Sequence, residues 1–288
     1  MYKFRPIRKT LVWGTEDWVL SGVPGNESVV AEGPDAGRKI SEIWPGEFPL
    51  LIKFIDARKD LSIQVHPDDA LAAKRHGCRG KTEMWYVIGA EPGASLVSGL
   101  KLGINPDEYA RRVADGTITD VLATHSVSAG DVFFLPAGRI HAIGGGCRLA
   151  EIQQTSDITY RIYDYNRPGL DGKPRQLHTE LAKDAIDYRV YDEYRTLYEP
   201  APDKDVLLVD CNCFRTTLLE LDAPFAKPLR GCGDFLIVIG LEGEGELACG
   251  EDSCRVAPGE AVLVPAADGD LQLNPSGPSL KVLTTCVP

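Results

Sequence analysis

The feature that most constrains the fold is a pattern of short strands that occurs twice in the chain. Residues 83–91 (Glu-Met-Trp-Tyr-Val-Ile-Gly-Ala-Glu) align with residues 234–242 (Asp-Phe-Leu-Ile-Val-Ile-Gly-Leu-Glu). Residues 129–137 align in the same way with residues 258–266, and both segments have Gly followed by an acid, an apolar run and Pro-Ala. Such repeated, turn-bounded strands are typical of double-sheet jelly-roll barrels. We therefore predict an all-β protein of two such barrels with a few short helices.

The composition fits this fold and excludes several functions. The chain has 288 residues, of which 43% are hydrophobic and 25% charged, enough to bury a sizeable core. A net charge of −11 argues against a nucleic-acid-binding surface. No apolar run is long enough for a transmembrane helix, and no apolar signal segment opens the chain. We expect a cytoplasmic protein, monomeric or homodimeric, that binds neither nucleic acid nor membrane.

The eight cysteines are interpreted as reduced packing residues. A chain of this length needs no disulfides to hold its core, and nothing in the sequence marks it for export. There is no C-x-x-C motif, and the one C-x-C pair, Cys211 and Cys213, would place both thiols on the same face of a strand.

The repeat also suggests a domain organisation. We assign residues 1–190 to a catalytic domain and residues 191–288 to a degenerate second copy. The segment Asn105-Pro106-Asp107-Glu108 predicts a helix start, with an N-cap, proline in the first turn and acids near the positive end of the helix dipole. This helix would end near Asp115 and form a short insertion in the first copy.

A candidate metal site lies in the first copy. Gln64 and His66 are two residues apart in an alternating run, so they can point to the same face of a strand. Glu83 and His141 come from segments that a barrel could bring to the same place. Two imidazoles, a carboxylate and an amide oxygen suit a divalent cation, Zn²⁺ first and Fe²⁺ as an alternative. In the second copy Asp234 aligns with Glu83, but no imidazole is available, so we expect that copy to lack the site.

Four sequence blocks then resemble a known family. They are Ser-x-Gln-x-His-Pro at 62–67, Lys-x-Glu-Met-Trp-Tyr at 81–86, Pro-Ala-Gly-x-x-His at 136–141 and Glu-x-x-x-x-Ser-Asp-x-x-x-Arg at 151–161. Together they resemble the type I mannose-6-phosphate isomerases of the cupin superfamily, in a short form without the large helical domain. The resemblance covers about residues 40 to 180.

The resemblance implies a role for each matching residue. It implies one Zn²⁺ per chain, bound by Gln64, His66, Glu83 and His141. It further implies an active-site Arg161, with Ser62 and Lys81 binding the sugar phosphate and Glu151 and Asp157 as acids of the pocket. One departure stands out: where long members have lysine six residues after the arginine, this chain has Arg167, which keeps the charge but changes its geometry.

The expected reaction interconverts mannose 6-phosphate and fructose 6-phosphate through an enediolate. Arg161 would stabilise the negative charge of the enediolate. Lys81 would act in the same cavity, and the base would be Glu151 or a metal-bound hydroxide, between which the sequence does not decide. Ser62, Lys81, Asp157 and Arg167 would bind the substrate.

Other interpretations remain open from the sequence. Arg161 could form a surface ion pair with Asp157 or Asp164, Lys81 could be solvated, and Glu151 could be a structural hydrogen-bond acceptor. At the level of function, the alternatives are an Fe²⁺-dependent cupin oxygenase and a non-catalytic cupin that binds sugar phosphates. The oxygenase alternative leaves Arg161, Lys81 and Ser62 without a role.

Overall fold

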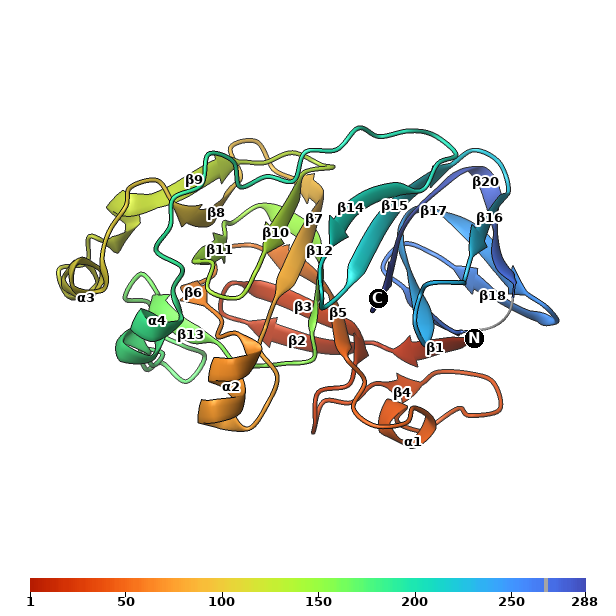
Figure 1. Cartoon of the computed structure of the whole chain (residues 1–288), viewed down its shortest axis with the longest axis horizontal. Helices are drawn as coiled ribbons and strands as arrows, with labels where there is room; N and C mark the ends of the chain where they lie inside the picture. The colour runs from red at the N-terminus through yellow and green to blue at the C-terminus, as the bar shows by residue number, and fades with distance from the viewer. Residues whose placement is uncertain (267–268) are drawn as a thin grey trace. The chain divides into compact units, whose positions relative to one another are not determined.

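The computed structural model describes residues 1–266 and 269–288 (Figure 1). Within these residues the chain forms twenty β-strands, four short α-helices and one 3-10 turn. The prediction of an all-β fold with a few short helices is confirmed. No helix in this part of the chain is long and apolar enough to cross a membrane.

The chain divides into two compact units. The first unit comprises residues 8–18 and 53–196, and the second comprises residues 1–7, 19–52 and 197–288. The assignment of residues 1–190 and 191–288 to two domains stays a prediction.

Two sheets build most of the first unit, and residues 19–21 and 50–52 of the six-stranded sheet are assigned to the second unit. The six-stranded sheet has the order β10-β7-β12-β5-β3-β2, and the five-stranded sheet has the order β13-β6-β11-β8-β9. The strands of the six-stranded sheet are β2 (Ile7–Leu11), β3 (Gly14–Ser21), β5 (Leu50–Ala57), β7 (Glu83–Ala90), β10 (Val132–Leu135) and β12 (Cys147–Gln154). Those of the five-stranded sheet are β6 (Ile63–Val65), β8 (Ser95–Leu100), β9 (Leu122–Ser126), β11 (His141–Ile143) and β13 (Tyr160–Tyr163).

Short helices lie at the edges of this unit. They are α2 (Asp69–His76), α3 (Pro106–Ala114), the 3-10 turn η1 (Ile118–Val121) and α4 (Thr179–Ala185). In Figure 1, α2 and α4 lie near β6 and β13, whereas α3 lies farther out, near β8 and β9. The predicted start of α3 is confirmed, because the Asn105 side chain accepts hydrogen bonds from the backbone N–H groups of Asp107 and Glu108. In α2, Asp68 is the N-cap and Gly77 ends the helix in a left-handed conformation.

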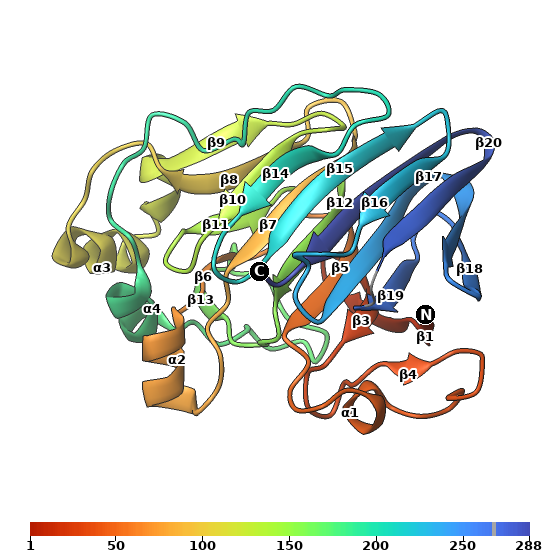
Figure 2. The ribbon, with the colours of Figure 1, turned by 45° about the vertical axis from the view of Figure 1, so that its right-hand side comes forward.

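The second unit is formed by one large sheet, whose long strands are seen in Figure 2. Its order is β14-β15-β20-β17-β19-β1-β4, with β16 paired to β20 and β18 to β17. The elements are β1 (Tyr2–Arg5), β4 (Val29–Val30), α1 (Ile40–Ile43), β14 (Val206–Asp210), β15 (Arg215–Leu221), β16 (Phe225–Pro228), β17 (Phe235–Cys249), β18 (Asp252–Val256), β19 (Ala261–Pro265) and β20 (Asp270–Cys286).

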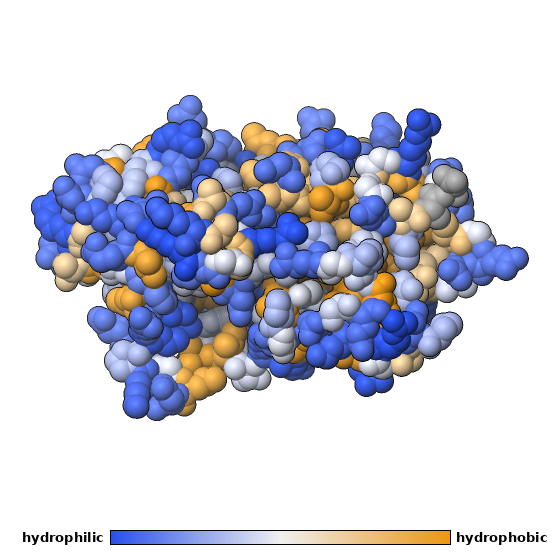
Figure 3. Space-filling view, turned by 60° about the horizontal axis from the view of Figure 1, so that its bottom comes forward, coloured by the Kyte–Doolittle hydropathy of each residue, from blue (hydrophilic) through white to orange (hydrophobic). Residues whose placement is uncertain are grey.

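Each unit has its own hydrophobic core. In the first unit one cluster is centred on Trp85 and Phe133, and another on Ile63, Tyr109 and Tyr160. In the second unit the cluster is made mainly of Leu and Val side chains from the large sheet. The surface is polar by contrast, and the face shown in Figure 3 is largely hydrophilic with small scattered hydrophobic groups.

Candidate active site and metal centre

Three predicted metal ligands meet in the first unit. His66 directly follows β6, while Glu83 begins β7 and His141 begins β11, so the two sheets together supply the group. One donor atom from each residue lies within 4.8 Å of the others. The Nε2 atom of His66 lies 3.5 Å from Glu83 Oε2, and that of His141 lies 3.2 Å from Glu83 Oε1. All three side chains are buried.

Both imidazoles are prepared to donate a lone pair. His66 Nδ1 lies 2.8 Å from the carbonyl oxygen of Ile158, and His141 Nδ1 lies 2.9 Å from that of Arg139. A carbonyl only accepts, so each Nδ1 carries the proton and each Nε2 lone pair faces Glu83. Burial lowers the pKa of His141 to about 3 and that of His66 well below its usual range, which keeps both rings neutral. This is the protonation state that metal binding requires.

Glu83 completes a donor set that fits a cation. Among the described residues neither carboxylate oxygen accepts a hydrogen bond of normal geometry, although both are buried. Lys81 Nζ lies 2.9 Å from Glu83 Oε2 and 3.1 Å from His66 Nε2. A positive charge is therefore favourable next to these two side chains. Burial raises the pKa of Glu83 to about 7, and the nearby Glu151 adds to this effect. A divalent cation at this place would stabilise the charged form of the buried carboxylate.

Gln64 provides the fourth predicted ligand. Its Nε2 lies 3.3 Å from His141 Nε2, next to the other three residues. A half-turn of the Gln64 side-chain amide exchanges its nitrogen and its oxygen. The amide oxygen, which can bind a metal, then lies at the same place. The structure thus brings all four predicted ligands together.

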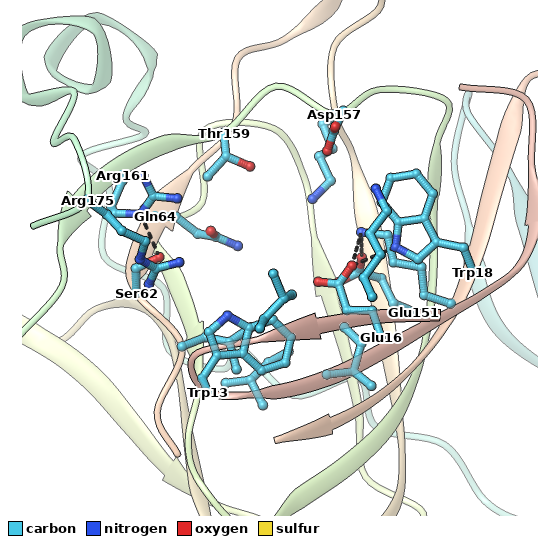
Figure 4. A pocket seen from close by; sticks show the side chains of 17 residues that line it. Trp13, Glu16, Trp18, Ser62, Gln64, Glu151, Asp157, Thr159, Arg161 and Arg175 are labelled. Carbon is cyan, nitrogen blue, oxygen red and sulfur yellow. Dashed lines mark hydrogen bonds and ion pairs between the residues drawn. The ribbon is translucent and has the colours of Figure 1, made fainter. Parts of the chain in front are cut away.

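A cavity of about 220 Å³ lies beside this group (Figure 4). Six residues predicted for the site line it, namely Ser62, Gln64, Lys81, Glu151, Asp157 and Arg161. Figure 4 shows Arg161, Arg175 and Ser62 on one side and Glu16 and Glu151 on the opposite side. We call the side with Arg161 and Arg175 the cationic wall, and the side with Glu16 and Glu151, where these carboxylates are paired with Lys53, the acidic wall.

The cationic wall is fixed by hydrogen bonds. Arg161 Nε donates to Ser62 Oγ at 3.3 Å, and its Nη1 donates to the carbonyl of Gln176 at 2.9 Å. Arg175 donates to both oxygens of the buried Asp164, each at 2.6 Å. Both guanidiniums are thus held in place on the cavity wall, and Arg161 is not a solvated surface residue.

Arg167 is held by contacts with Asp164 and Asp60. Its Nε donates to Asp164 Oδ1 at 2.9 Å and its Nη1 donates to the carbonyl of Asp60 at 2.5 Å. It is not among the described residues that line the cavity, whereas Arg175 is. The predicted contact of Arg167 with the substrate stays a prediction.

The acidic wall contains a buried ion pair. Lys53 Nζ lies 2.8 Å from Glu151 Oε1, and Trp85 Nε1 donates to Glu151 Oε2 at 2.8 Å. Glu16 lies 3.8 Å from the same ammonium and accepts from Trp18 Nε1 at 2.6 Å. Burial alone would raise the pKa of Glu151, but the positive charges of Lys53 and Lys81 outweigh it and lower that pKa to about 2. Glu151 is therefore a fixed carboxylate at neutral pH.

Sequence reasoning did not identify several residues of the cavity wall, among them the charged residues Lys9, Glu16, Lys53 and Arg175. Lys53 stands in the apolar run of residues 48–55, and a single lysine in a buried strand is a signal that could have revealed it. Arg175 comes from an irregular segment after β13, where nothing in the sequence indicates that it turns back toward Arg161.

Fold and site together define a cupin-type all-β protein with a buried His/Glu/His group suited to a metal ion. The family model described as "Phosphomannose isomerase type I, catalytic domain" matches residues 16–86. The mannose-6-phosphate isomerase ManA of Bacillus subtilis is 32% identical over 94% of this chain and 95% of its own length. The mannose-6-phosphate isomerase of Streptococcus mutans is 33% identical over 90% of this chain and 86% of its own length.

A solved structure agrees with these sequence matches. The crystal structure of the mannose 6-phosphate isomerase from Bacillus subtilis matches with a TM-score of 0.89 at 28% identity, covering 99% of this chain and 98% of that one. The chain belongs to the mannose-6-phosphate isomerase family. The family resemblance of the four sequence blocks is confirmed.

Proposed function

We propose that the protein is a metal-dependent mannose-6-phosphate isomerase that moves a proton between C1 and C2 of the open-chain sugar through an enediolate. The observation that supports this most is one cavity with a buried metal-binding group beside it, two fixed arginines on one wall and an ionised carboxylate on the other. Family membership supplies the substrate class.

We propose that Gln64, His66, Glu83 and His141 hold the metal. Two imidazoles, a carboxylate and an amide favour Zn²⁺ among divalent ions. A bound ion of this kind would act as a Lewis acid toward the sugar oxygens at C1 and C2. The neutral rings, fixed by the Ile158 and Arg139 carbonyls, keep their lone pairs directed at the site.

The substrate phosphate is assigned to the cationic wall. We assign it to Arg175 and Ser62, with Arg175 taking the role predicted for Arg167, because Arg175 lines the cavity. A guanidinium held by Asp164 is already oriented, so binding costs little side-chain entropy. Phosphate binding at this wall would place the other end of the sugar at the metal group. Asp157, which also lines the cavity, would accept from a sugar hydroxyl.

Arg161, Lys81 and Glu151 are assigned to the reacting end. Figure 4 shows Arg161 next to Gln64, so its permanent charge can stabilise the enediolate. Lys81 Nζ lies against Glu83 and His66, and there it would balance the same developing charge. Glu151 is the proposed proton acceptor, because Lys53 and Trp85 orient its carboxylate on the wall of the cavity, although the same contacts lower its pKa and so its strength as a base.

A coupled assay with mannose 6-phosphate tests the proposal. Activity should disappear on chelation and return when a divalent ion is added back. Zn²⁺ should restore more activity than the other divalent ions. Fully metal-loaded protein that binds mannose 6-phosphate without converting it would contradict the proposal and favour the non-catalytic binding protein. Oxygen consumption by the Fe²⁺-loaded protein would favour the oxygenase.

A further inference from the structure

The second unit repeats the strand order of the first. In the first unit the order β10-β7-β12-β5-β3 forms most of the six-stranded sheet. In the second unit the order β19-β17-β20-β15-β14 follows the same sequence of connections. The short strand β16 comes directly before β17 and pairs with β20, as β6 comes before β7 and pairs with β11. Equivalent positions can therefore be identified from strand register.

The register corrects the alignment predicted for the metal ligand Glu83. Glu83 pairs with Leu135 in β10, and the residue equivalent to Leu135 in β19 is Val264, which pairs with Leu236. The hydrogen bonds of the preceding turns agree, since the Val87 N–H donates to the Asp131 carbonyl and the Gly240 N–H donates to the Glu260 carbonyl. Glu83 thus corresponds to Leu236 rather than Asp234. An apolar side chain replaces the metal-binding carboxylate.

The acidic wall is replaced as well. Glu151 pairs with Trp85 in the first unit, and at the equivalent register Thr284 pairs with Val238. Thr217 of β15 pairs with Thr284, and their hydroxyl oxygens lie 2.7 Å apart. These two threonines stand where the first unit has the Lys53–Glu151 ion pair. Among the described residues of the second unit, neither the carboxylate nor the metal group of the first is present at these positions.

A cavity of about 220 Å³ nevertheless persists at this place. Leu236, Thr217 and Thr284 line it, as the register predicts, together with Lys227 of β16. Its other lining side chains are Asp205, Arg215, Pro228, Arg230, Cys232 and Cys286. The volume is below the roughly 300 Å³ at which drug-sized ligands begin, so only a small molecule fits.

The charge of this cavity is opposite to that of the chain. Arg215, Lys227 and Arg230 line it against one acid, Asp205, in a protein of net charge −11. Arg215 is also paired with Asp210 at 2.6 Å, which still leaves one positive charge in excess: three cations against two acids. Cations and hydroxyl groups together are the donors that bind a phosphate group.

Lys227 is the central feature of the site. Its side chain is 6% exposed, and its ammonium lies 2.5 Å from Asp205 Oδ2 and 3.2 Å from Thr217 Oγ1. Lysine is rarely buried unless it is paired, and here the ammonium stands on a cavity wall instead of in a packed core. It can therefore donate to a ligand while it keeps Asp205 as its partner.

We propose that this cavity is a second, metal-free binding site for a small phosphate-bearing ligand, either inorganic phosphate or a small phosphate monoester. Lys227 and Arg230 provide the charge, and the hydrogen-bonded pair Thr217 and Thr284 provides one further hydroxyl donor. With no equivalent of Glu83 or Glu151, the site binds without catalysis. The proposal does not rest on the isomerase activity, because its ligand contacts lie wholly within the second unit.

The test is protection of cavity thiols in the full-length protein. Iodoacetamide labels cysteines, and mass spectrometry resolves each one. Millimolar inorganic phosphate should slow alkylation of Cys232 and Cys286, which line the cavity, but not of Cys249 and Cys254, which lie outside it. Mannose 6-phosphate and unphosphorylated mannose are tested in parallel. Protection by the ester alone would identify a monoester as the ligand, and protection by phosphate alone would identify the free anion.

Two matched arginine variants distinguish a site from general electrostatics. Both Arg230 and Arg255 are exposed, but only Arg230 lines the cavity. Arg230→Ala should weaken phosphate protection about tenfold, and Arg255→Ala should leave it unchanged. Lys227→Met should abolish protection. Equal effects of the two arginine variants, or no protection by either phosphate compound in the wild-type protein, would overturn the proposal.

Discussion

Lys53 Nζ lies 2.8 Å from Glu151 Oε1, and both side chains are almost completely buried. Removing one partner leaves the other as an unpaired buried charge. We expect Lys53→Met to lower the free energy of unfolding by about 3–5 kcal/mol, as typical for breaking a buried pair. Urea unfolding followed by circular dichroism measures the change.

The double variant provides the control for this pair. In Lys53→Met/Glu151→Gln the buried charge of Glu151 is removed as well, and only the more exposed Glu16 loses its cation, so part of the lost stability should return. If the single variant is as stable as the wild-type protein, Glu151 is not held by Lys53 in solution. If the double variant is no more stable than the single one, packing rather than charge explains the loss.

The metal group gives a prediction that does not depend on turnover. His141→Ala removes a donor that faces Glu83, and we expect metal affinity to fall by more than about tenfold. His76→Ala is the matched control, because His76 is exposed and contacts the Tyr160 hydroxyl at 2.7 Å, outside the group. Metal content after dialysis, measured by inductively coupled plasma mass spectrometry, distinguishes the two. Equal metal content in both variants would contradict the assignment.

Local sequence patterns predicted the metal group better than the rest of the cavity. Alternation placed Gln64 and His66 on one face, and β6 is so short that His66 falls just beyond it and still reaches Glu83. Arg175 was not predictable, because its position depends on a contact with Asp164 across an irregular segment. Such long-range ion pairs leave no periodic signal in a sequence.

The repeat also shows a feature of the fold that the sequence pattern does not determine, namely the register between the two copies. Aligning the two copies on their glycines matched Glu83 with Asp234. The sheet register instead matches Glu83 with Leu236, because pairing with β10 and β19 sets the strand position. Sequence similarity predicted two copies of one module, but the offset between them depends on strand pairing.

Arg175 is expected to determine affinity for the phosphate group. Arg175→Gln should raise KM for mannose 6-phosphate about tenfold and change kcat little, since in the proposed binding mode the lost contact is to the phosphate and not to the reacting carbons. Arg175→Lys should recover only part of this loss, because lysine cannot reproduce the two-pronged contact with Asp164. Steady-state kinetics measures both parameters.

An exposed arginine of the same unit is the control for Arg175. Arg58 pairs with Asp56 at 2.8 Å and does not line the cavity. Arg58→Gln should leave KM unchanged. A larger rise in KM for Arg167→Gln than for Arg175→Gln would return the phosphate role to Arg167.

Asp164 should make the protein sensitive to acid. Burial alone would raise its pKa, but hydrogen bonds from Arg175 and Arg167 outweigh this and hold the pKa below its usual range. The folded pKa is then lower than the unfolded value of about 3.9, so this stabilisation is present at neutral pH and is lost as pH falls through the folded pKa. Asp164→Asn should cost about 2 kcal/mol at pH 7 and flatten the loss of stability below about pH 4. Thermal unfolding across this pH range, with the exposed Asp192→Asn as control, checks both effects. An unchanged acid transition in Asp164→Asn would show that other carboxylates control it.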